Sequence, residues 1–412
     1  MRILFVSCLL PYPTVAHAGG ADLFHLIASL GERGHDVYLV SLAPYPGDLA
    51  HADEMRPYCR SLAVVVPALT WGQKWRNLRR GLFTDPLHLG RRAQGEMRSH
   101  IRQIAANGLD VVQFEWTETG RFVDAVPAGP VTVLDEVDVS FQPRLRAART
   151  SRARWQAAHA RRRELALCRR FAVVLTRSAS DRDALLQALP GASVEVLQPW
   201  TRLDRFRDIR PAERQPGTVI FAGAMDRDEN CQAVLWFHRD CWPLIRTRVP
   251  EARLEIVGAS PQPCVQRLAH DPTVTVAGYV PDLREPYARC HVAIAPILYG
   301  GGVINKVIDA MAAGRPVVST TAGNEGVAAP PGQAVLVADE AQAFAHHVVA
   351  LLRDDLLWNR IAQGGRAHVQ QNYNWEQNVS RLEALYHRHV GATSVSPLPG
   401  GSWPPCETGG VA

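Results

Sequence analysis

Short apolar runs alternate with longer segments of helical spacing along almost the whole chain. Runs of this kind are typical of strands buried on both faces of a parallel sheet, with helices as the connections. In the first half, strands are predicted near residues 3–7, 37–42, 62–67, 110–115, 131–135, 172–176 and 194–197. In the second half, they are predicted near residues 219–223, 254–258, 274–278, 292–296, 317–321 and 334–337. The pattern predicts an α/β protein with two doubly wound parallel sheets.

A polar stretch that carries proline and arginine separates the two series of strands, and we interpret it as a linker. The predicted organisation is a Rossmann-like domain at 1–200, the linker at 201–216 and a second Rossmann-like domain at 217–371. A further helix is predicted at 372–391, and the Gly-, Pro- and Ser-rich tail at 392–412 is predicted to be disordered. Two such sheets place a ligand cleft between their carboxyl edges.

The first residues mimic a secretory signal, since Met1–Ala18 has one basic residue, a short apolar run and an Ala-His-Ala ending. We interpret residues 3–7 as the first strand instead. Gly19 and Gly20 would then open a helix over 21–33. Removal of the segment would delete a strand of the sheet, so no signal is expected.

The composition adds a few limits. With 412 residues, 47% hydrophobic and 21% charged, the chain has the length of two domains and the composition of a soluble protein. No apolar run approaches the roughly 18 residues that span a bilayer. The eight cysteines form no CxxC, which fits reduced thiols in a cytosolic protein better than a disulfide framework or zinc site. No DxD-type carboxylate pair is placed to hold a divalent metal, so no metal or other cofactor is expected.

The segment 295–321 carries the most informative chemistry. It is predicted to form a strand, a turn at Gly300–Gly302, a helix from about Val303 and a second buried strand. The free N–H groups at the start of a helix attract anions. Lys306 and Asp309 lie one turn apart on the polar side of this helix, which suits a nucleotide diphosphate and its ribose hydroxyls. The alternative is a solvated Lys/Asp pair on a helix that follows a flexible loop.

The second half of the chain resembles the GT-B glycosyltransferases of the group 1 family, glycosyltransferase family 4. The resemblance rests on four segments: FAGAMDRDENCQAVLWF (221–237), LEIVGASP (254–261), VAGYVPD (276–282) and GGGVINKVIDAMAAGRPVVSTTAGNEGV (300–327). In the first half, the Gly-Gly pair before a helix that ends in ERGHDV (32–37) is also typical. The resemblance implies a nucleotide-sugar donor on the second domain, an acceptor on the first and a final helix that crosses back.

The family usually carries two acids in the glycine-rich helix region. The resemblance aligns the second acid, which holds the ribose, with Asp309, and the first with Gly301, where the acid is absent. A glycine-rich GGGxxxK branch of the family lacks the first acid too. Lys306 would then face the diphosphate and stabilise the leaving group, together with the backbone of Gly301, Gly302 and Val303, which are also predicted to bind the donor.

Four further residues are predicted to bind the donor. Gly223 and Arg227 follow the first strand of the second domain, where relatives carry a phosphate clamp. Gly258 and Val280 match backbone positions that approach the base. The structural alternatives are a solvated loop charge for Arg227 and ordinary turn residues for Gly258 and the 278–280 turn.

On the first domain, Gly20 is predicted to bind the donor at the floor of the cleft. Many relatives place a histidine where this chain has Val137. We therefore predict Asp138 as a catalytic residue beside Lys306, and Glu136 and Glu115 on the acceptor side. Each of these acids could equally be a helix cap or a strand-end ion-pair partner.

Arginines are concentrated in the first domain despite a net charge of only +5. One cluster spans 142–170, and a second basic and aromatic patch spans 71–83. A positive, aromatic surface suits an anionic membrane or a lipid-linked acceptor, so the predicted location is cytoplasmic, with peripheral contact at the inner face of the membrane. An arginine-rich solvated helix is the alternative. No nucleic-acid-binding module accompanies the arginines, and no nucleic acid is expected.

Together with the resemblance, these observations predict a hexosyltransferase that uses a nucleotide sugar and a saccharide or lipid-linked acceptor in polysaccharide or glycoconjugate synthesis. Retention of the anomeric configuration is implied by the resemblance alone. Two alternatives stay open: a non-catalytic nucleotide-sugar-binding partner subunit, and a GT-B-like sugar-nucleotide epimerase. A hydride-transferring enzyme fits least well, because no GxGxxG follows a strand.

Overall fold

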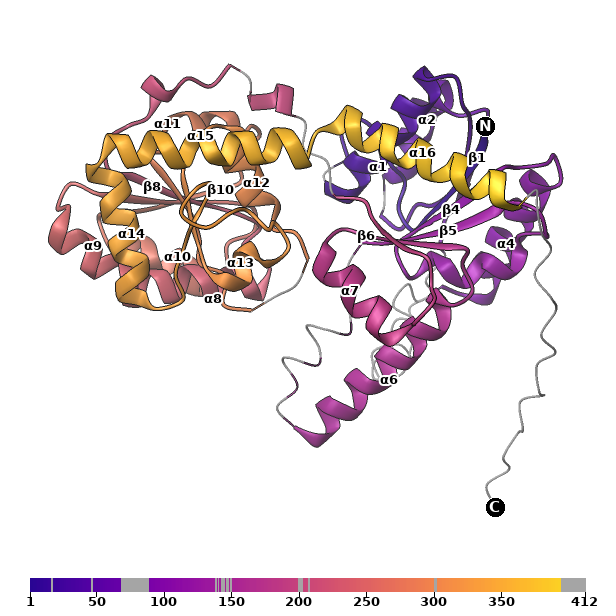
Figure 1. Ribbon diagram of the computed structural model, residues 1–412, viewed down its shortest axis with the longest axis horizontal. Helices are drawn as coiled ribbons and strands as arrows, with labels where there is room; N and C mark the ends of the chain where they lie inside the picture. Colours follow the sequence, from indigo (N-terminus) through magenta and orange to yellow (C-terminus); the bar gives the residue numbers. More distant parts are fainter. Residues whose placement is uncertain are drawn as a thin grey trace.

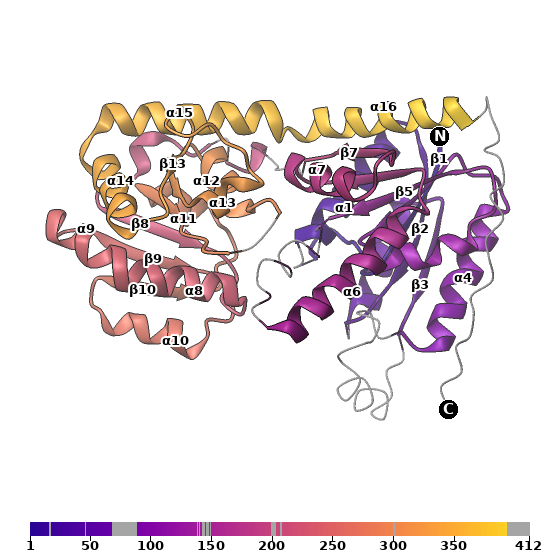
Figure 2. The same cartoon turned by 60° about the horizontal axis from the view of Figure 1, so that its bottom comes forward.

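The computed structural model describes residues 1–412 except 16–17, 46, 68–88, 138, 140, 142–144, 146–147, 149, 199–202, 207, 300–301 and 394–412. The described chain forms two lobes, each built on one parallel sheet with helices on both faces (Figure 1). The second sheet begins after the chain has completed the first, and the last helix returns to the first lobe (Figure 2).

The first sheet has the strand order β3-β2-β1-β4-β5-β6-β7 and is parallel throughout. Its strands are β1 (Arg2–Ser7), β2 (Asp36–Leu42), β3 (Ser61–Val65), β4 (Val111–Glu115), β5 (Val131–Glu136), β6 (Val173–Thr176) and β7 (Val194–Val196). Strand β1 pairs with both β2 and β4, so the apolar run at the start of the chain is a central strand of this sheet.

Helices cover both faces of this sheet, because successive side chains of a strand point to opposite faces. Ile3 and Phe5 pack with α1 (Ala18–Glu32) and α2 (Ala52–Met55) on one face. Leu4 and Val6 belong to the cluster on the other face. The helices of that face are α4 (Arg91–Ala105), α6 (Ser151–Cys168) and α7 (Ala179–Ala188).

The second sheet has the order β10-β9-β8-β11-β12-β13, also parallel. Its strands are β8 (Thr218–Ala222), β9 (Arg253–Val257), β10 (Val274–Gly278), β11 (Val292–Ala295), β12 (Val317–Ser319) and β13 (Leu336–Val337). One face is covered by α8 (Asp228–Trp236), α9 (Trp242–Arg248), α10 (Pro263–Gln266) and α14 (Ala341–Arg353). The other face is covered by α11 (Arg284–Arg289), α12 (Asn305–Ala312) and the end of α15 (Asp355–Asn372), while α13 (Thr321–Glu325) follows β12.

Helix α16 (Trp375–Thr393) continues beyond α15 along the same side of the molecule and lies on the first lobe (Figures 1 and 2). Its residues Val379, Leu382 and Tyr386 are fully buried in the cluster that contains Ile3 and Phe5. The last helix is therefore part of the hydrophobic core of the first domain, although it follows the second domain in sequence.

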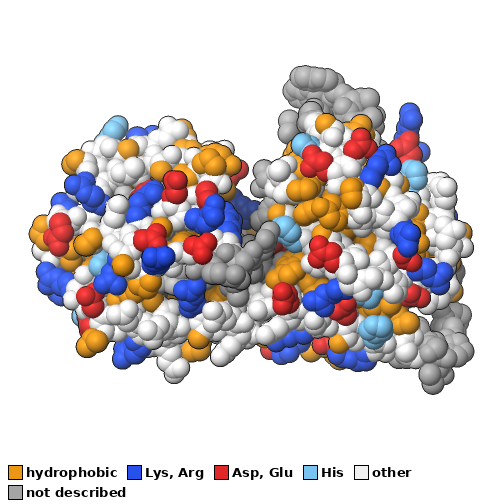
Figure 3. Space-filling model, turned by 90° about the horizontal axis from the view of Figure 1, so that it is seen from above, with side chains coloured by type: hydrophobic (Ala, Val, Ile, Leu, Met, Phe, Trp, Pro, Cys, Tyr) orange, Lys and Arg blue, Asp and Glu red, His pale blue; other side chains and the backbone are white. Residues whose placement is uncertain are grey.

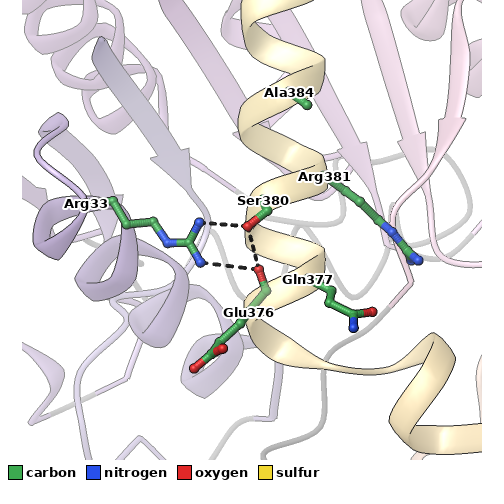
Figure 4. Close-up of a pocket in the computed structure, with 6 residues that line it drawn as sticks. All are labelled: Arg33, Glu376, Gln377, Ser380, Arg381 and Ala384. Atoms are coloured by element: carbon green, nitrogen blue, oxygen red, sulfur yellow. Dashed lines mark hydrogen bonds between the residues drawn. The ribbon is translucent and has the colours of Figure 1, made fainter.

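A shallow recess of about 570 Å³ lies between the end of α1 and α16 (Figure 4). In it, Arg33 donates hydrogen bonds to the Ser380 hydroxyl (2.9 Å) and the Glu376 carbonyl (3.3 Å). Arg33 also pairs with Glu383 at 2.6 Å. Because Arg33 shortly precedes β2, this recess lies at the amino edge of the sheet, opposite the edge where ligands bind such folds. We interpret it as a clamp that holds α16.

The predicted α/β fold with two doubly wound parallel sheets is confirmed. All thirteen predicted strands form, with ends within two residues of the predicted ones. The start of the first helix was wrong: α1 begins at Ala18, so Gly19 and Gly20 lie in its first turn instead of preceding it. The residues of the predicted disordered tail from 394 onward lie outside the described part of the chain.

Candidate functional site

Three glycines lie side by side where β8, β9 and β10 end. Gly223 donates its N–H to the Val257 carbonyl at 2.8 Å, and Gly258 donates to the Gly278 carbonyl at 2.8 Å. A Cβ at position 258 would lie 1.7 Å from the carbonyl oxygen of Gly223, well inside van der Waals contact. Only glycine fits at position 258, because the two strand ends approach so closely.

Lys306 lies across the end of β8. Its ammonium donates a hydrogen bond to Asn230 Oδ1 at 2.6 Å and stands 4.5 Å from the centre of the Phe221 ring. A Cβ on Gly223 would come within 3.0 Å of Lys306 Cε, so the glycine makes room for this side chain. Desolvation by burial and, to a smaller extent, the nearby Arg227 lower the pKa of Lys306 to about 7, against the opposing effect of Glu229.

Asp309 lies one turn after Lys306 on α12. Burial raises the pKa of this carboxyl to about 6, while Arg205 from the linker lowers it. The hydroxyl of Tyr287, on α11, donates to the Lys306 carbonyl at 3.3 Å and holds the first turn of α12 in place. A cation and an acid are thus presented together at the carboxyl edge of the second sheet, where both side chains are only partly exposed.

The loop before α12 differs from the prediction. The helix begins at Asn305 and not at Val303, because Ile304 has extended backbone (ψ 93°). Gly302 has φ +76°, and its carbonyl oxygen packs so tightly on Gly326 that a Cβ there would lie 2.1 Å from it. The loop is therefore anchored on α13, and Val303 lies in the loop before the helix. Gly300 and Gly301 are outside the described residues.

Arg227 and Val280 lie at the rim of this region. Arg227 is the residue that precedes α8, and its exposed guanidinium is 3.8 Å from Glu229 Oε1. An exposed pair of this kind contributes little to stability, which leaves the arginine available to a ligand. Val280 packs at the edge of the core cluster formed by α11 and α12.

On the first domain, Gly20 lies inside α1. A Cβ on Gly20 would come within 2.8 Å of Leu9 Cδ1 and 3.2 Å of Val15 Cγ1. The glycine lets the side chains of the loop after β1 pack closely on the helix.

Glu115 belongs to a buried group of charged side chains at the carboxyl edge of the first sheet. Asp135 lies directly opposite Glu115 on the neighbouring strand, and Arg177 donates to Asp135 Oδ2 at 2.5 Å. Burial and, after it, the adjacent Asp135 carboxylate raise the pKa of Glu115 to about 8. Asp22, in α1, faces the same group. Burial raises its pKa to about 7, and Asp309 of the second domain adds to that rise.

Asp22, Asp135 and Arg177 were missed at the level of sequence. For Asp135 and Arg177 a signal existed, since a charged residue that ends or directly follows an apolar strand lies at the carboxyl edge of a parallel sheet. Asp22 gave no such signal, because a polar residue in the first turn of a helix is common.

Glu136 does not join Glu115. Adjacent residues of a strand face opposite sides of the sheet, so Glu136 points to the α6 side while Asp135 points to the α1 side. Thr117 donates to Glu136 Oε1 at 2.5 Å, and burial together with the charge of Glu164 on α6 raises its pKa well above the usual value. Asp138, predicted as catalytic, lies outside the described residues.

The second domain matches the family model described as "Glycosyl transferases group 1" over residues 216–354. An uncharacterized 44.6 kDa protein in the cps region of Klebsiella pneumoniae is 25% identical over 216 residues, which are 50% of this chain and 54% of that protein. The chain thus spans about half the length of this relative.

Solved structures resemble the chain over nearly its whole length. Sucrose-phosphate synthase from Thermosynechococcus elongatus has a TM-score of 0.73 at 18% identity, with 95% of this chain and 100% of that chain covered. HepE from Anabaena in complex with UDP has a TM-score of 0.65 at 15% identity, covering 94% and 100%. TarM from Staphylococcus aureus, in a complex that includes UDP, has a TM-score of 0.67 at 8% identity, covering 94% and 100%. These likenesses establish the GT-B fold.

Proposed function

We propose that this protein is a retaining glycosyltransferase of the glycine-rich branch of glycosyltransferase family 4. It transfers a hexose from a nucleoside-diphosphate sugar to a hydroxyl of a saccharide or lipid-linked acceptor, in the synthesis of a cell-surface polysaccharide or glycoconjugate. The observation that carries the proposal is the Lys306 ammonium, held between Phe221 and Asn230 at the carboxyl edge of the second sheet. The match to group 1 glycosyl transferases covers this edge.

In this proposal the diphosphate lies beside Lys306, the Gly302 backbone and the start of α12, while Asp309 accepts hydrogen bonds from the ribose. As the bond between the anomeric carbon and the β-phosphate oxygen breaks, the electron pair moves onto the phosphate. The Lys306 ammonium stabilises this charge where it develops, which is the most effective position for a catalytic cation. The acceptor hydroxyl approaches from the first domain, with Glu115 and Asp22 on that side. The proposal needs no metal, so a chelator should leave the transfer rate unchanged.

The decisive test is a thermal-shift panel of UDP-, GDP-, ADP- and TDP-sugars, followed by assays of donor hydrolysis and transfer. Stabilisation by one nucleotide class, with transfer to an acceptor, supports the proposal. Binding with neither hydrolysis nor transfer identifies a non-catalytic partner subunit, as the absence of the family acid at Gly301 and of the histidine at Val137 would allow. A new nucleotide sugar in an acceptor-free mixture identifies an epimerase. If none of the nucleotides binds, the assignment of the donor site is wrong.

The lowered pKa of Lys306 predicts proton uptake on nucleotide binding. Below about pH 7 the ammonium is already charged, but at about pH 8 most of it is neutral in the free protein. A diphosphate raises its pKa, so binding at about pH 8 should take up nearly one proton, and affinity should fall as the pH rises above about 7. Calorimetry with UDP in buffers of different protonation enthalpy measures the uptake.

Two features make this measurement specific. Lys306→Met should abolish the uptake, and an unchanged proton count in this variant would contradict the assignment. The chain has only two lysines, Lys74 and Lys306. In a Lys74→Arg protein labelled with ¹⁵N-lysine, the single side-chain signal therefore reports the titration of Lys306 directly.

We also propose that the protein associates peripherally with anionic membranes through α6. Arg152, Arg154, Arg162 and Arg163 of this helix are all exposed, and Trp155 is 55% exposed. Among the described residues no acidic side chain forms an ion pair with these arginines. Figures 1 and 2 show α6 projecting from the first lobe, whereas basic and acidic side chains are interspersed on the face in Figure 3. The basic patch at 71–83 lies outside the described residues.

Charge reversal tests this association. The double variant Arg162→Glu with Arg163→Glu is expected to lose most co-sedimentation with vesicles of anionic phospholipid at low salt, because each basic residue near the surface contributes about 1 kcal/mol. The matched control, Arg267→Glu with Arg360→Glu, makes the same change in net charge at exposed sites of the second domain. Equal binding of both variants to the vesicles, or no binding of the parent protein, would contradict the proposed membrane association. No helix in the described part of the chain is long and apolar enough to cross a membrane.

A further inference from the structure

A line of buried polar side chains runs from α16 to the carboxyl edge of the first sheet. The Tyr386 hydroxyl donates to Gln113 Oε1 at 2.5 Å, and Gln113 Nε2 donates to Glu115 Oε1 at 2.7 Å. Tyr386 and Gln113 are 0% exposed, and Glu115 is 3% exposed. Water therefore does not replace any of these contacts, and each polar group depends on the next.

The hydroxyl decides which way the amide points. A buried glutamine can offer either its oxygen or its nitrogen to a neighbour. The Tyr386 hydroxyl donates to the oxygen, which leaves the Gln113 N–H groups directed at the Glu115 carboxyl. Burial keeps the pKa of Tyr386 well above its usual value, so the hydroxyl retains its proton and acts as the donor. The amide that donates to Glu115 is thus oriented by a residue of α16.

Other elements also present charged or titratable groups to Glu115. They are Asp135 of β5, the Arg177 guanidinium after β6, Asp22 of α1 and, from the loop after β1, the Cys8 thiol. Asp135 and Asp22 disfavour a charge on Glu115, whereas Arg177 and the Gln113 amide favour it. Among these groups, the Gln113 amide is the one whose orientation depends on α16, through the hydroxyl of Tyr386.

We infer that Tyr386 and Gln113 are positioning residues that orient the Glu115 carboxyl and link the seating of α16 to the acidic edge of the first domain. The assignment of this edge to the acceptor rests on the proposed function, whereas the hydrogen bonds themselves do not. Because α16 continues from α15 of the second domain, a change in how the two domains meet can alter the hydrogen bond that Glu115 receives.

The test is a titration that needs no substrate. The infrared band of the protonated Glu115 carboxyl is identified by its loss in Glu115→Gln and followed with pH in the full chain. Tyr386→Phe keeps the ring and removes the hydroxyl. Since a hydrogen bond contributes about 1 kcal/mol, the midpoint should rise by roughly half to one pH unit. Gln113→Leu, which removes the donor itself, should raise it at least as much.

Val379→Ala is the matched control, because it weakens the packing of α16 without touching the polar line. It should lower the melting temperature and leave the midpoint unchanged. An unchanged midpoint in both Tyr386→Phe and Gln113→Leu overturns the inference. If the parent protein transfers sugar, the pH profile of its rate should move in the same direction in Tyr386→Phe. Absence of transfer counts against the proposed function alone, since the titration is read without it.

Discussion

Replacing Lys306 by alanine is expected to lower the turnover of sugar transfer about 100- to 1000-fold, the loss typical of removing one group that stabilises the charge of a transition state. The free energy of unfolding should change by less than about 1 kcal/mol. The lost hydrogen bond to Asn230 and the contact with the Phe221 ring are offset by removal of a cation that is costly to bury. Steady-state kinetics and urea denaturation measure the two effects.

Asn305→Ala is the control for this variant. Asn305 precedes Lys306 in the first turn of α12 but is exposed, so its replacement should leave turnover within about twofold of the parent value. Near-normal turnover of Lys306→Ala would remove the lysine from the mechanism. A similar loss in both variants would show that the start of α12, and not the ammonium, is responsible.

Replacing Gly258 by alanine is expected to destabilise the protein by about 3 kcal/mol and to abolish nucleotide binding. The new Cβ would overlap the carbonyl oxygen of Gly223, at 1.7 Å, so the ends of β8 and β9 must move apart. Gly223 is also the residue that accommodates Lys306, and its displacement would move the lysine away from the diphosphate. Urea denaturation and the nucleotide-induced thermal shift measure the two effects.

Gly332→Ala is the control variant, because it introduces backbone strain without steric overlap of the new Cβ. Gly332 has φ +74°, and a Cβ added to it would meet no other atom within 4 Å, so alanine there should cost only about 1 to 2 kcal/mol. Nucleotide binding should be retained in this variant. If Gly258→Ala were no less stable than Gly332→Ala, the close approach of the two strand ends would not be the reason for glycine at position 258.

Most of the fold could be predicted from the sequence, because a strand that is buried on both faces appears in the sequence as an uninterrupted apolar run. The runs near 3–7 and 219–223 each became a central strand of its sheet, β1 and β8. Helix starts were less certain. The glycines at 19–20 and 300–302 suggested boundaries, but the hydrogen-bonded helices begin at Ala18 and Asn305, since packing on neighbouring segments decides where a helix begins.

The candidate site was predictable only in part. Lys306 and Asp309 share one helix, and their spacing alone placed them together. The acids of the first domain come from different strands, and their grouping depends on register. Glu115 lies opposite Asp135, which turns Glu136 to the other face of the sheet, so the two acids predicted on the acceptor side point in different directions.

The sequence by itself determined the elements and their parallel arrangement, because apolar runs and glycines set the local backbone structure through residues that are close in sequence. Only the tertiary structure decided the charge states. The pKa values of Lys306 and Glu115 are set by burial and by partners such as Asn230, Asp135 and Gln113. Except for Gln113, two residues before Glu115, these partners are distant in sequence, and only the packing of strands and helices brings them within reach.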